Sequence, residues 1–290
     1  MPKIRSLTIL TLLAALISGA FAQGYPPLSS EAAERIRLGE AAAQSALDTY
    51  SRHYPDLPLW QEAFEYAEQA ISLAPGNPEP LRFKAIAYTL ANWYGPAWTV
   101  WQDFLGRGFP LDASATPVFV EAGQRLAYSQ YEQGNLELSL RTYLAVLDEV
   151  PFDLESVSWA GRILMELERP AQAISYWTTI TERDPADARA VYFRDLARDQ
   201  VEWGVEATNE FRLGVSFYES GSLTQARDHF TRATLLNSSY PEAFAWLGRV
   251  AFELGNFQDA RTHYTRASQL EPANETYRYF MEESARRLGD

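Results

Sequence analysis

The feature that most constrains the fold is a segment that the chain repeats at a fixed distance. Residues 245–260 read AWLGRVAFELGNFQDA, and residues 211–226 read FRLGVSFYESGSLTQA. A Leu-Gly pair, an aromatic residue, a glycine and an alanine occupy the same places in both, 34 residues apart. Self-similarity at a period of roughly 20–50 residues is typical of arrays in which one structural unit stacks on the next.

Each shared position has a physical reason within a pair of helices. Leucine and the aromatic residue recur at helical spacing and form the inner stripe of the first helix. The small residue after the leucine and the alanine of the second helix let two backbones approach closely. Glycine in the turn tolerates the positive φ of a helix C-terminus, and a proline after the second helix ends it. Each repeat is therefore predicted to be a helix, a turn and a second helix.

The same register extends through most of the chain. Five copies begin at residues 78, 120, 154, 207 and 241, and AEQAISLAPGNPE at 67–79 belongs to the second helix of a half-copy whose first helix is expected within 31–53. Two segments interrupt the period, a predicted loop at 112–119 and an additional predicted helix at 188–206. Residues 275–288 are amphipathic and are expected to form a capping helix that covers the last hydrophobic face.

The pattern around Gly248 resembles the tetratricopeptide repeat (TPR). Leu247, Gly248, Ala260, Tyr264 and Pro272 fall at the consensus places of that family. The resemblance implies an all-α fold, a right-handed α-solenoid of TPR-like helix-turn-helix repeats with an inserted helix and a C-terminal capping helix. We expect a signal peptide at 1–22, an N-terminal TPR-like array at 23–187, the inserted helix at 188–206, and C-terminal repeats with the capping helix at 207–290.

The N-terminal residues have the order of a secretory signal peptide. Lys3 and Arg5 precede the uncharged run LTILTLLAALI, and Ala20-Phe21-Ala22 forms a small-residue cleavage site. We expect cleavage near Ala22-Gln23 and a periplasmic or secreted mature chain without stable membrane insertion, an uncleaved anchor being the alternative. The chain has no cysteine, which suits an oxidising compartment and excludes thiolate chemistry.

Composition and motifs exclude several classes of function. The formal net charge is −13, whereas a nucleic-acid-binding protein normally has a basic face. The sequence has no Gly-x-Ser-x-Gly elbow, no phosphate-binding glycine loop and no His-Glu-x-x-His helix, so we expect no enzyme activity and no cofactor. His229 and His263 are 34 residues apart, but two histidines without a third ligand make a poor metal site. We interpret them as outward-facing polar residues repeated by duplication.

The resemblance implies that the first helix of each repeat lines a concave groove, through positions 2, 5, 9, 12 and 13 of the repeat. In this chain those positions carry glutamates, an apolar and aromatic stripe and two arginines. A solvated helix face is the alternative, because glutamate is common on exposed helices. Trp101, Tyr143, Trp177, Phe230 and Tyr264 are expected in the core instead. The predicted partner-binding residues are Tyr128, Tyr131, Glu132, Arg162, Glu166, Tyr218, Glu219, Arg249, Phe252 and Glu253.

These observations predict an exported scaffold or adaptor that mediates protein–protein interaction in the cell envelope or secretion machinery. A solenoid offers a long groove without a reactive centre, so binding of a protein or peptide is the expected function. The alternative is a non-catalytic module that binds a glycan or another non-protein envelope ligand on a surface rich in Trp and Tyr. The sequence indicates neither the identity of the partner nor the oligomeric state.

Overall fold

The computed structural model describes residues 24–289, and within them it contains fourteen α-helices and no strand. The predicted signal peptide, residues 1–22, lies outside the described residues. The first six helices are α2 Ser30–Thr49, α3 Pro58–Leu73, α4 Pro78–Leu90, α5 Tyr94–Gly106, α6 Ala115–Glu132 and α7 Leu136–Glu149. The others are α8 Leu154–Glu166, α9 Pro170–Arg183, α10 Ala188–Trp203, α11 Val205–Glu219, α12 Leu223–Leu236, α13 Pro241–Glu253, α14 Phe257–Leu270 and α15 Glu275–Leu288. The predicted all-helical, solenoid-type class is confirmed.

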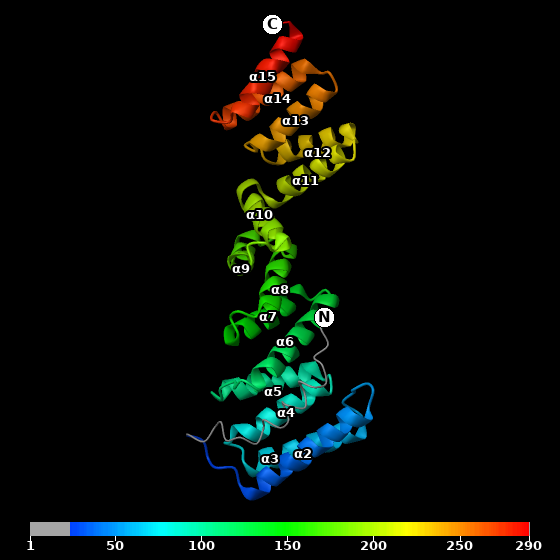
Figure 1. The fold of residues 1–290 in the computed structure, drawn as a ribbon, viewed down its shortest axis with the longest axis vertical. Coiled ribbons are helices and arrows are strands. Elements are labelled where there is room, and N and C mark those ends of the chain that lie inside the picture. Colours follow the sequence, from blue (N-terminus) through cyan, green and yellow to red (C-terminus); the bar gives the residue numbers. More distant parts are fainter. Residues whose placement is uncertain (1–23, 290) are drawn as a thin grey trace. The chain divides into compact units, whose positions relative to one another are not determined.

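The helices form pairs in the predicted register. The five copies correspond to α4–α5, α6–α7, α8–α9, α11–α12 and α13–α14, and neighbouring helices pack along the chain (Figure 1). The half-copy is a complete pair, α2–α3. The capping helix is α15, and Phe280 of this helix stacks on Tyr264 with ring centroids 5.3 Å apart.

The chain divides into two compact units, of which the first ends at Trp159 and the second begins at Ala160, within α8. The predicted bounds of the two arrays, at 23–187 and 207–290, stay a prediction. The inserted helix, α10, lies inside the second unit because it is attached at both ends. Phe193 stacks on Trp177 of α9 at 5.0 Å, and Trp203 stacks on Tyr240 at 4.8 Å.

The turn between the two helices has the same backbone conformation in all five copies. Gly134, Gly221 and Gly255 have φ angles of 78°, 79° and 76°, and Asn92 and Glu168 have 59° and 56° at the equivalent place. In each copy the next amide N–H donates to a carbonyl five residues before it, at 2.8–2.9 Å. This is the Schellman arrangement that ends a helix. The turn conformation thus repeats even where glycine does not.

The small residue of the first helix has a different role from the one predicted. It makes room for the aromatic ring that lies sixteen residues later on the second helix, rather than for a second backbone. Trp177, Phe230 and Tyr264 are all buried, as are Trp101 and Tyr143, which confirms them as core. A Cβ atom would lie 2.9 Å from the ring of Trp177 at Gly161, 2.6 Å from Phe230 at Gly214 and 2.7 Å from Tyr264 at Gly248.

The predicted loop at 112–119 is shorter than expected, because α6 already begins at Ala115. Asp112 accepts hydrogen bonds from the backbone N–H groups of Ser114 and Ala115, at 2.8 and 2.7 Å. A side chain that satisfies these free N–H groups starts a helix. Val118 and Phe119, which the sequence pattern placed in the loop, are buried in the core of the first unit.

Candidate functional site

The ten predicted groove residues all lie on first helices of the repeats, but they fall in both compact units. The first unit holds Tyr128, Tyr131 and Glu132, on α6. The second unit holds the rest, on α8, α11 and α13. Each unit is described by itself below, and a single groove along both stays a prediction.

In the first unit, an aromatic cluster joins α6 to the start of α8. Tyr128 and Tyr131 stack with ring centroids 6.4 Å apart, and both make edge contacts with Trp159, at 5.3 and 5.1 Å. Trp159 in turn lies parallel to the buried ring of Tyr143 at 5.9 Å, which fixes its orientation. Tyr128, Tyr131 and Trp159 are half-buried, and Glu132 beside them is exposed. The sequence reasoning missed Trp159.

In the second unit, a polar and aromatic cluster joins α11 to α13. The Nε–H of Arg249 donates to the Tyr218 hydroxyl at 2.8 Å, and that hydroxyl donates to the carboxylate of Glu253. The Arg249 guanidinium lies over the rings of Tyr218 and Trp246, 4.8 and 5.0 Å from their centroids. Burial and the bond to Glu253 both raise the pKa of Tyr218. Trp246 is the second residue that sequence reasoning missed.

The two predicted arginines are partly neutralised within their own helices. Arg162 pairs with Glu166 at 2.9 Å, and Arg249 pairs with Glu253 at 3.5 Å. Each pair spans four residues, which places both side chains on one helix face. Phe252 does not join the cluster around Tyr218 but contacts Phe257 and Phe280, at 5.2 and 6.1 Å. It therefore belongs to the packing of the capping helix.

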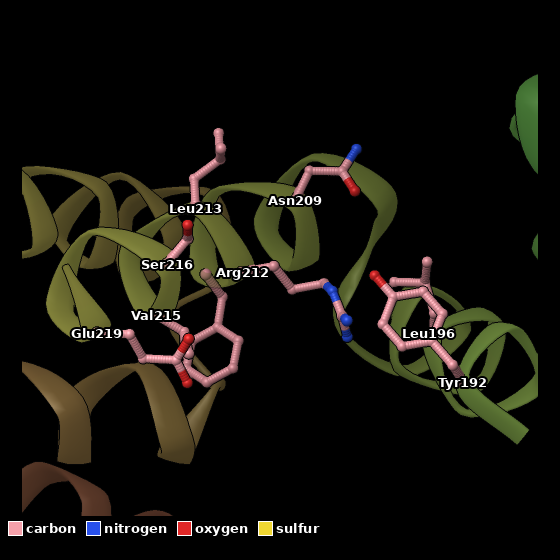
Figure 2. A pocket seen from close by; sticks show the side chains of 9 residues that line it. Tyr192, Leu196, Asn209, Arg212, Leu213, Val215, Ser216 and Glu219 are labelled. Atoms are coloured by element: carbon pink, nitrogen blue, oxygen red, sulfur yellow. The ribbon is translucent and has the colours of Figure 1, made fainter. Parts of the chain in front are cut away.

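A hollow of about 740 Å³ lies between α10 and α11 (Figure 2). Tyr192 and Leu196 line it from α10, and Arg212, Val215 and Glu219 line it from α11. Arg212 extends from α11 towards Tyr192, and its guanidinium lies 4.5 Å from the centre of that ring. Of these five residues, only Glu219 was among the predicted partner-binding residues. α10 lies outside the 34-residue period, so the helical repeat pattern alone gives no sign of this hollow.

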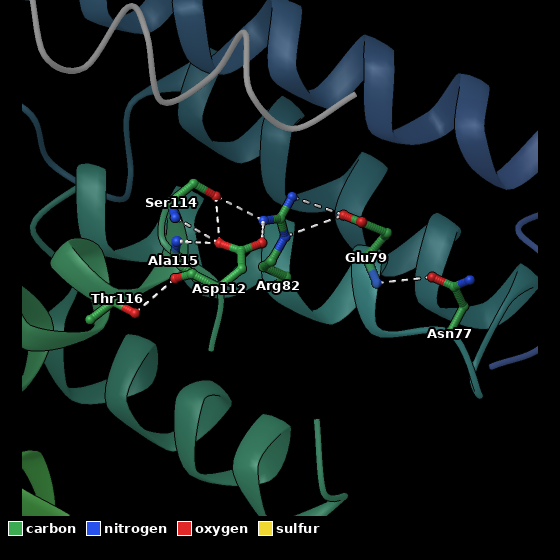
Figure 3. A network of polar contacts seen from close by, with 7 residues as sticks. All are labelled: Asn77, Glu79, Arg82, Asp112, Ser114, Ala115 and Thr116. Carbon is green, nitrogen blue, oxygen red and sulfur yellow. Dashed lines mark hydrogen bonds and ion pairs between the residues drawn. The ribbon is translucent and has the colours of Figure 1, made fainter. Parts of the chain in front are cut away.

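A buried ionic network lies in the first unit (Figure 3). Arg82 of α4 is 2% exposed and pairs with Glu79 at 3.1 Å and with Asp112 at 2.5 Å. Its guanidinium also donates to the Ser114 hydroxyl at 3.0 Å. Glu40 of α2 is a third carboxylate near Arg82, and its Oε1 is buried without a hydrogen-bond partner among residues 24–289. Burial raises the pKa of Glu40 to about 7.

The two equivalent histidines differ from their predicted orientation, because both are half-buried. Nδ1 of His229 lies 2.7 Å from the Glu210 carboxylate, and its ring stacks on Phe217 at 4.9 Å. Burial lowers the pKa of His263. Within residues 24–289 there is no group of three or more His, Cys, Asp or Glu side chains placed to hold a metal ion.

A membrane span would need a helix both long and apolar, and none of the helices between residues 24 and 289 meets both conditions. The candidate sites are therefore two aromatic and charged clusters, one in each unit, together with the hollow beside α10.

Comparison with known proteins identifies the repeats. A family model described as tetratricopeptide repeat matches residues 124–177 and 211–275, so these segments are TPR repeats. No curated protein matches the chain in sequence.

Several solved structures are similar to the chain. A tetratricopeptide repeat protein from Parabacteroides merdae is 13% identical, with 89% of this chain and 100% of that one covered and a TM-score of 0.40. TTC0263, a TPR protein of Thermus thermophilus, is 16% identical, with 88% and 98% covered and a TM-score of 0.30. YrrB, described as a TPR protein with an unusual peptide-binding site, is 17% identical, with 74% and 97% covered and a TM-score of 0.33.

Proposed function

We propose that this chain, whose residues 124–177 and 211–275 are TPR repeats, is an exported scaffold that binds protein or peptide segments in the cell envelope or secretion machinery. The observation that carries the proposal is the half-buried aromatic surface on the first helices. In the first unit it consists of Tyr128, Tyr131 and Trp159. In the second it consists of Tyr218 and Trp246 with the Arg249–Glu253 pair.

These clusters have the chemistry of protein-binding surfaces. Tyrosine, tryptophan and arginine are the residues that most often carry the affinity of an interface. The two aromatic residues bury a large area at low conformational-entropy cost. Contacts within the chain also hold both clusters in one arrangement. In the first unit, the buried ring of Tyr143 stacks on Trp159. In the second, hydrogen bonds join Arg249, Tyr218 and Glu253. A preorganised surface loses less conformational freedom when a partner binds.

Export is supported by the N-terminal sequence alone. Residues 1–22 have the charged, apolar and small-residue order of a signal peptide, and the chain has no cysteine that an oxidising compartment could cross-link. The formal net charge of −13 also suits partners with basic surfaces, since opposite charge accelerates encounter.

A glycan is the second candidate ligand, and the aromatic cluster of the first unit favours it. Three half-buried rings that contact one another offer apolar faces on which a sugar ring could stack. The cluster of the second unit fits this ligand less well, because the Arg249 guanidinium covers the rings of Tyr218 and Trp246.

Chemical cross-linking in the native envelope, followed by affinity capture of the mature chain, tests the proposal. Tyr131→Ala and Tyr218→Ala should each reduce the cross-linked partner about tenfold, as expected for a residue that carries binding energy. Tyr279→Ala is the matched control, because Tyr279 is exposed on α15. Unchanged partner yields in both test variants would contradict the proposal. Capture of purified glycans with no protein would favour the alternative.

A further inference from the structure

The hollow between α10 and α11 is built differently from the rest of the repeat surface. One of its walls is α10, which lies outside the 34-residue period. That wall is held in place at both ends. Near the start of α10, Phe193 stacks on the buried ring of Trp177. At its end, Trp203 stacks on the buried ring of Tyr240, and the Trp203 carbonyl accepts a hydrogen bond from Asn237 at 2.8 Å.

Arg212 gives the hollow a positive charge that no ion pair within the described chain neutralises. Among residues 24–289 it makes no ion pair, in contrast to Arg162 and Arg249 on the equivalent helices. Asp199 of α10 interacts electrostatically with Arg212. Burial raises the pKa of Asp199, and the positive charge of Arg212 lowers it by a smaller amount. The guanidinium lies over Tyr192, so the ring holds the cation in place without cancelling its charge.

The remainder of the hollow is mainly apolar, with the polar side chains of Asn209 and Ser216 and one acidic residue. Leu196, Phe211 and Val215 contribute apolar side chains. Tyr192 and Leu213 are 47% and 46% exposed, which is high for side chains of their size. Glu219 lies one turn of α11 beyond Val215 and adds a carboxylate. Figure 2 shows Glu219 beside Val215 on α11, and Arg212 extending away from them towards Tyr192 and Leu196 of α10.

We propose that this hollow binds a short linear segment of a partner protein that carries an Asp or Glu next to a large apolar residue, with a Lys or Arg beyond it. The partner carboxylate pairs with Arg212, the apolar side chain covers Val215, and the basic residue reaches Glu219. The assignment rests on the proposed function and names the chemistry of the segment that the scaffold takes. The charge complementarity is the argument for this occupant, because a neutral or purely basic segment would leave Arg212 without a partner.

The energetic reasoning favours Arg212 as the selecting residue. A guanidinium that already lies over an aromatic ring, and is half-buried, loses little freedom when it pairs with a carboxylate. Removing one partner of such a pair at an interface typically weakens binding by more than tenfold. Glu219 is exposed, so its ion pair with the basic residue of the segment should contribute less to the affinity than the pair at Arg212. Its main effect should be to disfavour segments with an acidic residue opposite Glu219.

A phage-displayed library of random peptides, selected on the chain from residue 23 onwards, tests the proposal. Selection on the wild type should enrich Asp or Glu next to a large apolar residue. Selection on Arg212→Glu should lose that enrichment and gain Lys or Arg at the same place. Arg141→Glu is the matched control, because Arg141 is exposed on α7 of the first unit, and it should select the wild-type pattern.

The best enriched peptide then serves as a probe in fluorescence anisotropy, paired with a version whose acidic residue is changed to the amide. The amide version should bind the wild type about tenfold more weakly, and Arg212→Gln should bind both versions equally. The proposal is overturned if no peptide is enriched, if wild type and Arg212→Glu select the same peptides, or if Arg212→Gln still distinguishes the two versions. If instead Tyr131→Ala and Tyr218→Ala lose partner capture while the Arg212 variants keep it, the scaffold function stands and this site alone is refuted.

Discussion

Replacing Glu40 with Gln should stabilise the first unit at alkaline pH and have much less effect at acidic pH. Glu40 is the third carboxylate around Arg82, which already pairs with Glu79 and Asp112. Its Oε1 is buried and has no hydrogen-bond partner in the described part of the chain. The ionised carboxylate therefore loses hydration that its electrostatic interaction with Arg82 offsets only in part.

The magnitude follows from the pKa. Burial raises the pKa of Glu40 from 4.5 to about 7, so the folded state holds a proton that the unfolded state releases. The free energy of unfolding therefore falls as the pH rises from about 4.5 to about 7, and the loss is complete above the folded pKa. At about 1.4 kcal/mol for each pKa unit, the full loss has an upper limit of about 3 kcal/mol. Solvent screening of a group that is not fully buried reduces this to about 1–3 kcal/mol.

Urea unfolding monitored by tryptophan fluorescence at pH 5 and pH 8 measures the effect. Glu40→Gln should exceed the wild type by about 1–3 kcal/mol at pH 8 and by under about 1 kcal/mol at pH 5. Glu62→Gln on α3 is the control for removing a charge, because Glu62 is exposed. Comparing variants removes the contribution of Glu79, whose pKa burial also raises. An advantage of equal size at both pH values would refute the reasoning.

Three further predictions follow from the repeats and the N-terminus. Glu168 and Gly221 both have positive φ, which glycine adopts more easily than other residues. Glu168→Gly should therefore raise the free energy of unfolding by about 0.5–1 kcal/mol, and Gly221→Ala should lower it by about 1 kcal/mol. If urea unfolding showed that both variants change the free energy in the same direction, the prediction would be wrong. In the same assay, Gly214→Ala should lower the free energy of unfolding by about 1–3 kcal/mol, because the new Cβ would lie 2.6 Å from the Phe230 ring. Ala127→Gly, at the equivalent position of another repeat, should lower it by only about 1 kcal/mol. The intact mass of the native protein should correspond to a chain that begins within about two residues of Gln23. The mass of the full-length chain would exclude cleavage.

The period of the repeat was sufficient to predict the order and pairing of the ten helices in the five copies. Its 34-residue spacing located five pairs, and the amphipathic pattern of 275–288 gave the bounds of α15 correctly. The start of α6 was missed because Pro117 and the small polar residues around it are typical of a loop. A proline is equally compatible with the first turn of a helix, where its missing N–H has no partner to lose. Only the position of the Asp112 carboxylate distinguishes the two cases.

The division of the chain could not be predicted from the period. Extra residues between two repeats can form either a separator or a wall of the neighbouring repeat. Which of the two occurs depends on whether their apolar side chains find a partner. Here Phe193 and Trp203 each stack on a buried aromatic ring, so α10 joins the second unit. The hollow that results has no counterpart in a regular array and depends on this tertiary packing.

Three site residues that sequence reasoning missed on the repeats, Trp159, Arg212 and Trp246, share the sixth position, whereas the implied groove used positions 2, 5, 9, 12 and 13. Residues three and seven places apart lie on one helix face, so position 6 shares a face with positions 9 and 13. The structure contains this stripe twice in the second unit beyond Ala160. One set lines the hollow, and the other forms the cluster around Tyr218. The two sets are Arg212, Val215 and Glu219 on α11, and Trp246, Arg249 and Glu253 on α13.

The two stripes differ in whether their arginine and glutamate form an ion pair with each other, and this difference decides what each can bind. On α13 the arginine is at position 9, four residues before the glutamate, so the two pair within the helix. On α11 the arginine is at position 6, seven residues before Glu219, and Val215 separates them. Moving the charge by one turn thus turns an internal ion pair into a cation and an anion at opposite ends of an apolar surface. Exchanging Arg212 and Val215 should therefore form the internal pair on α11 and abolish selection for an acidic peptide, while preserving the net charge.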